Sequence, residues 1–391
     1  MLSICRVLPN LTIQMLVPDP EETDLSSVVY GQLALGSEET PMNIDRRRLL
    51  IGTAALSFAA SAPAIVRAQQ NASKIRVGLV PLISSGPIFI AEARKFFEKI
   101  NLDAELKYFA DGALAMPALV AGELDLTATT LNAGLFNTVA KGAPFKLVLD
   151  RGSEKPGHGS MTIVASNDFY EQGYRSANDG AKLKGKTIAI QAPGSIDQYL
   201  LGRAAEKAGL NAKTDLNWSS GMPYPDMIKL MGAGRADAAN IPVPLAFLAE
   251  KNQVGKIVGP GSDIEPDAQL ACWVMSSSYL AANKSAAVRF AMVHTYAARL
   301  FNKAAAEKDP DVVKIIADAT KVPAALVTAA APRWTWYTDD GLPNADSVMA
   351  QFKFVSQSMN MVSGQVTPDM LFDLTAAKEA AERLKTSNPF T

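Results

Sequence analysis

Cysteine and histidine are scarce in this 391-residue chain. It has two cysteines, Cys5 and Cys272, and two histidines, His158 and His294. If the N-terminal segment is removed, Cys272 stands alone, which excludes an internal disulfide and a cysteine-based zinc site. Two histidines far apart in sequence also argue against a histidine-rich metal centre or a Ser-His-Asp triad. We therefore predict no cofactor, no metal site and no catalytic residues.

Net charge and long apolar runs are lacking as well. The 38 basic and 39 acidic residues leave a formal charge of −1. A nearly neutral chain has no bulk attraction for nucleic acid or an anionic membrane, so we expect a local pocket to select the ligand. After residue 68 no uninterrupted apolar stretch reaches the ~20 residues of a membrane span.

Residues 46–68, RRRLLIGTAALSFAASAPAIVRA, have the pattern of an export signal. Three arginines precede a short apolar run, and a small-residue cleavage site follows at Ala68. The paired arginines resemble a twin-arginine signal. A buried N-terminal helix is the alternative, but the segment ends in the polar residues 69–71.

We therefore predict a signal peptide over residues 42–68, cleaved near Ala68, and a periplasmic mature protein. Met42 is the expected translation start, because it places the arginines where a signal needs them. Residues 1–41 then form a non-native or unstructured extension.

The remaining chain alternates β-rich runs with segments of helical spacing, and it does so twice. Strand-like runs in the first unit, 74–164, lie at 75–80, 102–109, 124–129 and 145–149. A helical segment follows the first run, at 88–100. In the second unit, 166–271, strand-like runs lie at 187–191, 217–220, 236–241 and 256–258. Strands separated by single helices predict an α/β fold with parallel sheets covered on both faces.

Two strand-like segments, 161–166 and 271–276, enter and leave the second unit, and both end in serine. Helical segments follow through residue 330, and they need the first unit to cover. The sequence thus predicts two lobes joined by a two-strand hinge. Lobe 1 comprises residues 74–164 plus 273–391, and lobe 2 comprises residues 165–272.

Ligands of open α/β sheets bind at the carboxyl ends of the strands, where helix N-termini favour anions. In lobe 1 this predicts Ser84 and Ser85 as donors to a ligand oxygen, with Gly86 keeping the backbone accessible. Helix capping by Ser85 is an equal alternative. For Thr130 and Asn132 the same two roles are open: contact with the ligand or capping of the next helix.

Three further lobe 1 residues are candidates. The Asp111 carboxylate, beside Gly112, would repel an anion, so it either caps a helix or contacts a ligand N–H. Arg151 is the candidate charged anchor, because a guanidinium clamps a carboxylate in bidentate fashion. A solvated surface arginine is the alternative.

In lobe 2, Gly194 and Ser195 open a helix directly after a strand, which predicts an anion seat. A simple helix cap is again the alternative. Other lobe 2 candidates lie beside that seat or at later strand ends: Ile196, Met222, Tyr224 and Asn240. Tyr224 either stacks on a flat ligand or packs between its flanking prolines.

Three features outside these loops carry other expectations. We expect His158 to be an exposed loop residue and His294 to be structural. The aromatic run Arg333-Trp334-Thr335-Trp336-Tyr337 favours core packing, with one face free to reach the cleft rim.

Four segments resemble the nitrate/sulfonate/taurine-type substrate-binding proteins of ABC importers, a group that includes thiamine-precursor binders. Their order and spacing carry the likeness over about residues 74–300. The segments are IRVGLVP at 75–81, with Pro87 and Ala91-Glu92 after it; ALVAGELDL at 118–126; LKGKTIAI at 183–190, followed by Pro193-Gly194-Ser195; and KLMGAGRADA at 229–238.

The resemblance implies a type II periplasmic-binding fold with the ligand between the lobes, and a permease and an ATPase as partners. We expect a monomer that captures a small organic anion, a sulfonate or carboxylate whose body could be aromatic. Family members often have a second Ser or Thr where this chain has Ile196, which weakens a purely sulfonate or nitrate assignment. An enzyme on the same fold, similar to pyrimidine-synthesis proteins, and a ligand-loaded sensor subunit are the alternatives.

Overall fold

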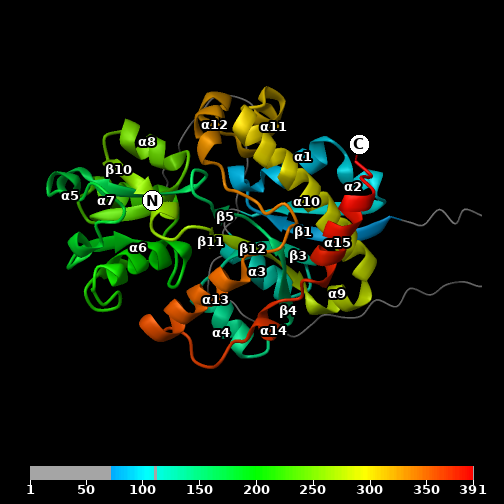
Figure 1. The fold of residues 1–391 in the computed structure, drawn as a ribbon, viewed down its shortest axis with the longest axis horizontal. Helices are drawn as coiled ribbons and strands as arrows, with labels where there is room; N and C mark the ends of the chain where they lie inside the picture. Colours follow the sequence, from blue (N-terminus) through cyan, green and yellow to red (C-terminus); the bar gives the residue numbers. More distant parts are fainter. Residues whose placement is uncertain (1–71, 110–111, 391) are drawn as a thin grey trace, which may run out of the picture. The chain divides into compact units, whose positions relative to one another are not determined.

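The computed structural model describes residues 72–109 and 112–390, and these described residues belong to one compact unit (Figure 1). The predicted signal peptide and the extension before it lie outside the described residues. Asp111 lies outside them too.

The first sheet has five strands in the order β2-β1-β3-β12-β4. They are β1 (Ser73–Leu79), β2 (Leu102–Tyr108), β3 (Leu126–Thr130), β4 (Phe145–Asp150) and β12 (Ala271–Ser276). β1 runs parallel to β2 and β3, whereas β12 runs antiparallel to β3 and β4. Apolar residues dominate β1 and β12 because helices cover both faces of the sheet.

The second sheet repeats this arrangement in the order β10-β6-β9-β7-β8. Its strands are β6 (Met161–Ser166), β7 (Thr187–Ala189), β8 (Asn217–Ser219), β9 (Ala238–Pro242) and β10 (Gly255–Pro260). Here β6 runs antiparallel to both of its neighbours. The prediction of purely parallel sheets is therefore wrong. β6 and β12 each enter a sheet from the hinge side, at the carboxyl edge of the other strands, so each must run backwards.

A two-stranded antiparallel ladder, β5 (Ser153–Glu154) with β11 (Ala268–Gln269), lies between the two sheets (Figure 1). We call it the hinge, and we call the parts built on the first and second sheets the first and second lobes. The boundaries predicted at 164/165 and 272/273 fall inside β6 and β12. The sheet order puts the passage between the lobes before each of these boundaries, at β5 and β11.

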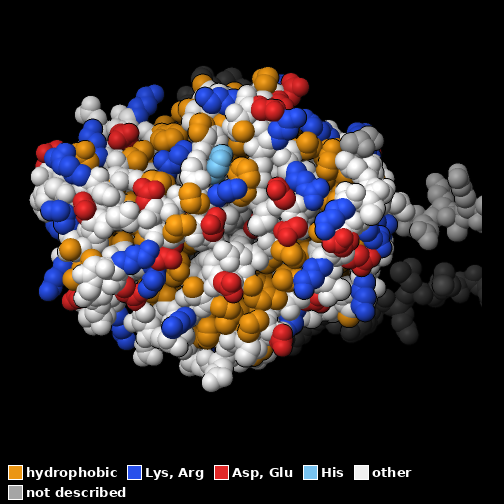
Figure 2. Space-filling model, in the orientation of Figure 1, with side chains coloured by type: hydrophobic (Ala, Val, Ile, Leu, Met, Phe, Trp, Pro, Cys, Tyr) orange, Lys and Arg blue, Asp and Glu red, His pale blue; other side chains and the backbone are white. Residues whose placement is uncertain are grey.

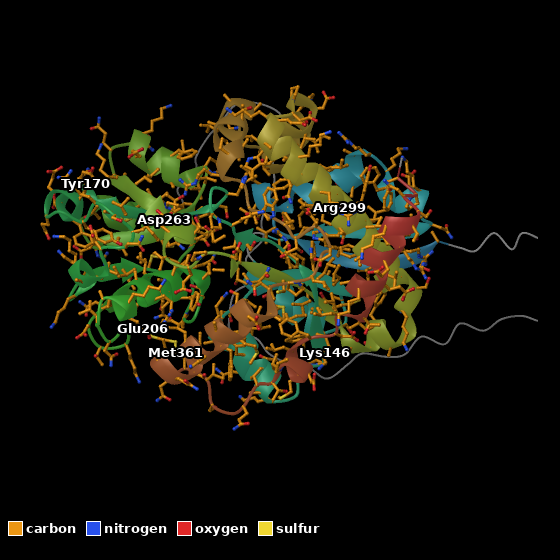
Figure 3. All side chains as sticks on the ribbon, viewed as in Figure 1. Lys146, Tyr170, Glu206, Asp263, Arg299 and Met361 are labelled. Carbon is orange, nitrogen blue, oxygen red and sulfur yellow. The ribbon has the colours of Figure 1, made fainter. Side chains whose placement is uncertain are left out.

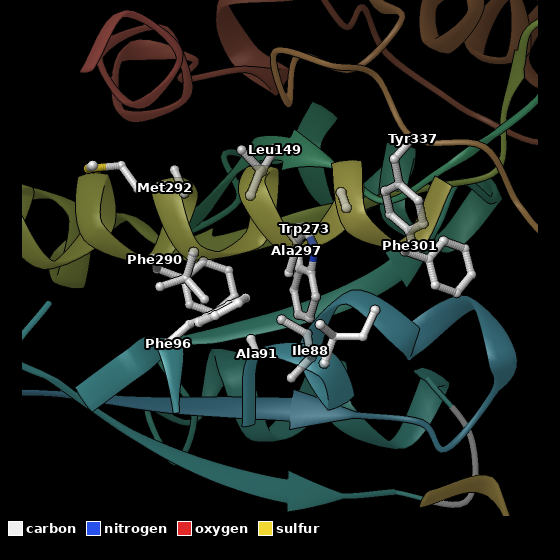
Figure 4. Close-up of a cluster of buried hydrophobic side chains, with 14 of the residues drawn as sticks. Ile88, Ala91, Phe96, Leu149, Trp273, Phe290, Met292, Ala297, Phe301 and Tyr337 are labelled. Carbon is white, nitrogen blue, oxygen red and sulfur yellow. The ribbon is translucent and has the colours of Figure 1, made fainter. Parts of the chain in front are cut away.

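The first-lobe helices include one long helix, α10, which packs on α1 and α15. Their bounds are α1 (Gly86–Ala93), α2 (Phe96–Lys99), α3 (Gly112–Val120), α4 (Ala133–Ala140), α9 (Ser277–Ala282), α10 (Lys284–Glu307), α11 (Pro310–Thr320), α12 (Ala324–Ala330) and α15 (Thr375–Thr386). The single helix predicted over 88–100 is broken, because Lys95 adopts a left-handed φ of 57° between α1 and α2. In the core, Trp273 of β12 meets Phe290 of α10 edge-on, with ring centroids 5.4 Å apart (Figure 4).

The second-lobe helices are α5 (Asn167–Glu171), α6 (Ile196–Lys207), α7 (Tyr224–Gly232) and α8 (Leu245–Lys251). A C-terminal segment touches both lobes: α13 (Ala345–Lys353), the π-helical turn Phe354–Ser358 and α14 (Pro368–Leu371). Phe352 packs on Phe136 of α4, and Phe354 packs on Tyr199 of α6, each pair with ring centroids 5.5 Å apart. These contacts join the cores of the two lobes behind the hinge.

Both lobes carry the same clamp at the amino edge of their sheets. Asp125 accepts a hydrogen bond from the backbone N–H of Arg76 at 2.8 Å, and Asp237 accepts one from that of Thr187 at 2.8 Å. Each aspartate carbonyl also accepts the N–H of the serine that ends the crossing strand. These residues close the Gly-x-x-Asp sequences of the family-like segments, so that pattern serves the fold.

Acidic and basic side chains are interspersed over the visible face, with no extended field of one sign (Figure 2). In the described part of the chain, no helix combines the length and apolarity that a membrane crossing requires.

Candidate functional site

Arg151, directly after β4, is a buried guanidinium at the carboxyl edge of the first sheet. Only 6% of the residue is exposed. Its Nη2 donates to Ser85 Oγ at 2.8 Å and its Nη1 donates to Tyr337 Oη at 3.1 Å. Its carbon Cζ lies 5.8 Å from the Trp273 ring centre. The alternative of a solvated surface arginine is therefore wrong.

Within the described residues, no carboxylate lies at ion-pair distance from Arg151, and its Nε has no acceptor. The neighbouring Asp150 directs its oxygens to neutral donors: the N–H of Gly152 and Thr338 and the amide of Gln269. Burial raises the Asp150 pKa above its usual value. A buried cation whose contacts are a hydroxyl, a phenol and an indole face is suited to an external anion.

Ser84, Ser85 and Gly86 lie together at the start of α1. Ser85 stands at the N-cap position, but its hydroxyl does not cap the helix; it donates to the Val80 carbonyl at 2.6 Å and accepts from Arg151. The carbonyl of Ser84 accepts the Tyr337 hydroxyl. A Cβ on Gly86 would overlap the Phe301 ring, so glycine lets α1 begin against the core.

The loop that follows β3 in the first lobe contacts the loop that follows β7 in the second. Asn132 caps α4, because its side chain accepts from the N–H of Leu135 at 2.9 Å and its amide donates to the Thr130 carbonyl at 3.3 Å. The next N–H, of Ala133, donates to the Pro193 carbonyl of the second lobe at 3.1 Å. The structure thus brings Thr130 and Asn132 next to Gly194. A Cβ on Gly194, where φ is +74°, would lie 2.7 Å from Ala133 N.

The predicted anion seat at the start of α6 is filled by the chain's own side chains. Asp197 accepts the N–H of Gln191 at 3.0 Å and the hydroxyl of Ser195 at 3.3 Å. Gln198 accepts the N–H of Gly194 at 2.7 Å. Asp197 is fully buried, and burial raises its pKa to about 7. Ile196 is buried in the core.

Asn240 lies on the α6 face of the second sheet, opposite Ile163 of β6. It is fully buried, and both polar atoms of its amide lack a partner among the described residues. Gln198 Nε2 and Asp197 Oδ1 are unpaired in the same way. Met222 and Tyr224 pack beside the α7 core.

The candidate residues thus form two groups. Ser84, Ser85, Gly86 and Arg151 gather around Tyr337, whereas Thr130, Asn132, Gly194 and Ser195 gather where the lobes touch. Gly112 begins α3. These roles in ligand binding remain predictions.

Sequence reasoning missed Tyr337 and Asp197 as parts of the site. Tyr337 belongs to the aromatic run, but its partner Arg151 lies 186 residues away in the sequence, so only the structure reveals their contact. Asp197 had a local signal, since a carboxylate in the first turn of a helix competes for its free N–H groups.

His294 is buried beneath Trp273 and Tyr337, as expected for a structural residue. Burial first, and then nearby Arg151, lower its pKa to about 3. His158 is partly exposed and packs on Trp336, with ring centroids 4.7 Å apart. In the described ranges, no group of three or more His, Cys, Asp and Glu residues is placed to hold a metal ion.

Solved structures of low sequence identity share this fold. The ligand-binding component of an ABC-type import system from Staphylococcus aureus superposes with a TM-score of 0.64 at 20% identity, covering 79% of this chain and 99% of that one. The nitrate-binding protein NrtA from Synechocystis PCC 6803 gives 0.67 at 14% identity, covering 81% and 90%. The alkanesulfonate-binding protein SsuA from Xanthomonas axonopodis pv. citri, bound to MOPS, gives 0.60 at 19% identity, covering 77% and 98%. The predicted type II periplasmic-binding fold is confirmed.

Sequence relatives are named as binding proteins. "Putative binding protein YtlA" of Bacillus subtilis is 22% identical over 241 residues, which are 61% of this chain and 69% of that protein. "Putative binding protein BAB2_1146" of Brucella abortus is 26% identical over 231 residues, 57% of this chain and 65% of that protein. The match thus spans about two thirds of each relative.

The family model that matches covers residues 68–317, well over half of the chain. It includes both sheets and the hinge, and it ends before the aromatic run at 333–337. The chain is a member of the NMT1-like family.

Proposed function

We propose that this protein is the solute-binding subunit of an ABC importer and that its ligand is a small organic anion. The anionic group would lie at Arg151, in the first lobe. The observation that carries the proposal is the buried Arg151 guanidinium, which has no carboxylate partner in the described part of the chain. A buried charge is costly unless it is paired, and an anionic ligand would supply the missing partner.

The second lobe supports a different kind of contact. Asp197 fills the α6 seat, and a second anion there would face a carboxylate. The unpaired amide of Asn240 and the unpaired Nε2 of Gln198 offer uncharged donors and an acceptor instead. We therefore infer that the anionic end of the ligand faces the first lobe.

The importer role, with a permease and an ATPase as partners, has support from the likeness to a ligand-binding component of an ABC-type import system. Export to the periplasm has support from the likeness to a periplasmic nitrate-binding protein. An enzymatic role has less support. His294 is enclosed in the core, and His158 lies against Trp336 and not beside Arg151. A sensor role would use the same binding site.

The test is a thermal-shift screen of the full chain after partial unfolding and refolding, to remove carried-over ligand. The panel holds alkyl and aryl sulfonates, aliphatic and aromatic carboxylates, pyrimidines and nitrate. A ligand at about 100 times its dissociation constant should add ~2.7 kcal/mol to the free energy of unfolding. No shift with any anion would overturn the proposed ligand class.

Arg151→Met should then weaken binding of the best anion by about 100-fold, because hydrogen bonds to a charged group contribute about 1.5–3 kcal/mol each. Arg175→Met, which removes an exposed guanidinium from the second lobe, is the matched control and should bind as the wild type does. Equal affinity of all three proteins would contradict an anion site at Arg151.

A further inference from the structure

The segment Arg333–Thr338, here called the strap, lies across the hinge. The backbone of Trp336 pairs with that of Ser153 in β5, through N–H···O bonds of 2.8 and 3.3 Å. The strap thus adds a third chain to the two-stranded hinge. It also lies beyond residue 317, where the family match ends.

Toward the second lobe, the strap holds the chain that leads into β6. Arg333 donates to the Gly159 carbonyl at 2.9 Å and to Thr162 Oγ1 at 2.8 Å. Thr335 donates to Ser160 Oγ at 2.9 Å. Ser160 in turn donates to Glu154 of β5 at 3.2 Å, which ties this contact back to the hinge.

Toward the first lobe, the strap reaches the anion site. The Tyr337 hydroxyl accepts from Arg151 and donates to the Ser84 carbonyl. The Tyr337 backbone is fixed to α10 by Asn302, through bonds of 2.8 and 3.2 Å. Arg299 of α10 donates to the carbonyl of Asp339, just beyond the strap, at 2.7 Å. Figure 3 shows Arg299 in the first lobe and Asp263 in the second. Asp263 interacts electrostatically with Arg333 at the other end of the strap.

The fit between strap and hinge is close. Gly152 has a φ of +100°, and a Cβ there would overlap Thr335 Cγ2. Both the conformation and the space therefore call for glycine at the residue between Arg151 and β5.

We propose that the strap is a third connection through the hinge, separate from the C-terminal segment that joins the lobes elsewhere, and that Tyr337 is a positioning residue that couples an anion at Arg151 to the angle between the lobes. The anion part of this inference rests on the proposed function. An anion that draws on Arg151 shifts the Tyr337 hydroxyl bonds, and the strap carries that shift to Ser160 and Thr162. The coupling requires a strap fixed to both lobes, which its hydrogen bonds provide.

The test measures the distance between the lobes in the full chain carrying Cys5→Ser. Spin labels are placed at Lys229→Cys in the second lobe and Lys314→Cys in the first, whose side chains are 78% and 75% exposed. Cys272 is fully buried and is not expected to react. Without ligand, Thr335→Val and Arg333→Met should broaden the distance distribution. Thr335→Ser, which keeps the hydroxyl, should have the same distribution as the wild type. Unchanged distributions in folded Thr335→Val and Arg333→Met proteins would overturn the third connection.

The second arm uses Tyr337→Phe, with MOPS and the best anion of the screen as probes. The variant should bind at least about 10-fold more weakly and lose the ligand-dependent change in distance. Tyr174→Phe is the control, because it removes another buried tyrosine hydroxyl, one without a partner in the described structure. Wild-type affinity in Tyr337→Phe would overturn the positioning role. If no probe binds the wild type, that role falls with the ligand class, while the distance measurement still decides the third connection.

Discussion

The two lobes place a serine at the same point and surround it with opposite charges. Ser85 follows β1 and Ser195 follows β7, each at the N-cap of the next helix, and neither hydroxyl caps that helix. Ser85 accepts from the Arg151 guanidinium, whereas Ser195 donates to the Asp197 carboxylate. Equivalent positions in a repeated fold thus place a guanidinium beside one serine and a carboxylate beside the other. A helix N-terminus alone does not locate the anion, because a first-turn side chain can occupy it first.

The largest change in the free energy of unfolding should come from replacing the Asp197 carboxylate, which lies beside Ser195, with a neutral amide. The Asp197 pKa is about 7 in the folded protein and 3.8 by its ordinary value, so the folded state binds the proton more tightly. The stability that the folded state has with Asp197 protonated is fully present below about pH 4. It is lost as the pH rises to 7, because the carboxyl group of the unfolded chain ionises first. Asp197→Asn should therefore be more stable than the wild type at pH 8, by up to about 4 kcal/mol, and equal to it near pH 4.

Chemical denaturation at pH 4, 6 and 8 measures this difference. Asp226→Asn, on the exposed side of α7, controls for the loss of one negative charge. A constant difference between Asp197→Asn and the wild type at all three pH values would contradict the raised pKa of Asp197 in the folded protein.

The next effect compares the clamps at the opposite edge of the sheets. Asp125 binds the Arg76 side chain at 2.6 and 3.0 Å, whereas Asp237 lies 3.4 Å from Lys186 and is more exposed. Asp125→Ala should cost about 3 kcal/mol and Asp237→Ala about 1.5 kcal/mol of unfolding free energy. Equal losses in urea unfolding would mean that the arginine fork adds nothing to the first clamp.

The smallest effect concerns the serines that end the crossing strands. Ser166 accepts the N–H of Phe169 at 3.2 Å, and Ser276 accepts that of Tyr279 at 3.5 Å. Ser166→Ala should lower the free energy of unfolding by about 1 kcal/mol, and Ser276→Ala by less, since its bond is longer. A larger loss for Ser276→Ala in thermal unfolding would reverse this ranking.

Local pattern was enough to predict most strands and the two lobes. Runs such as 75–80 and 145–149 are apolar because they are buried on both faces, and that signal needs no distant partner. Strand direction was not in the pattern, because β6 and β12 run backwards only as a result of entering from the hinge. The helix break at Lys95 was missed for a related reason. The helical spacing of apolar residues continues past Lys95, although its backbone adopts a left-handed φ.

The positions of several candidate residues could be predicted from the sequence, but their hydrogen-bond partners could not. Arg151, Ser85 and Ser195 were named from their places after strands, and the structure puts them at the carboxyl edges of the sheets. Their hydrogen-bond partners include Tyr337, which reaches Arg151 through a tertiary contact, and Asp197, which reaches Ser195 through a turn geometry that spacing does not encode. The same limit kept the strap from being recognised within an aromatic run.

The insertion of β12 between β3 and β4 sets an order for folding during synthesis. All strands of the second sheet lie within residues 161–260, so that sheet has its full set before β12 leaves the ribosome. The first sheet has a gap between β3 and β4 until Ser276 has been made, because these two strands are joined only through β12. The part made first is thus completed last, and its exposed strand edges must be kept from other chains until then.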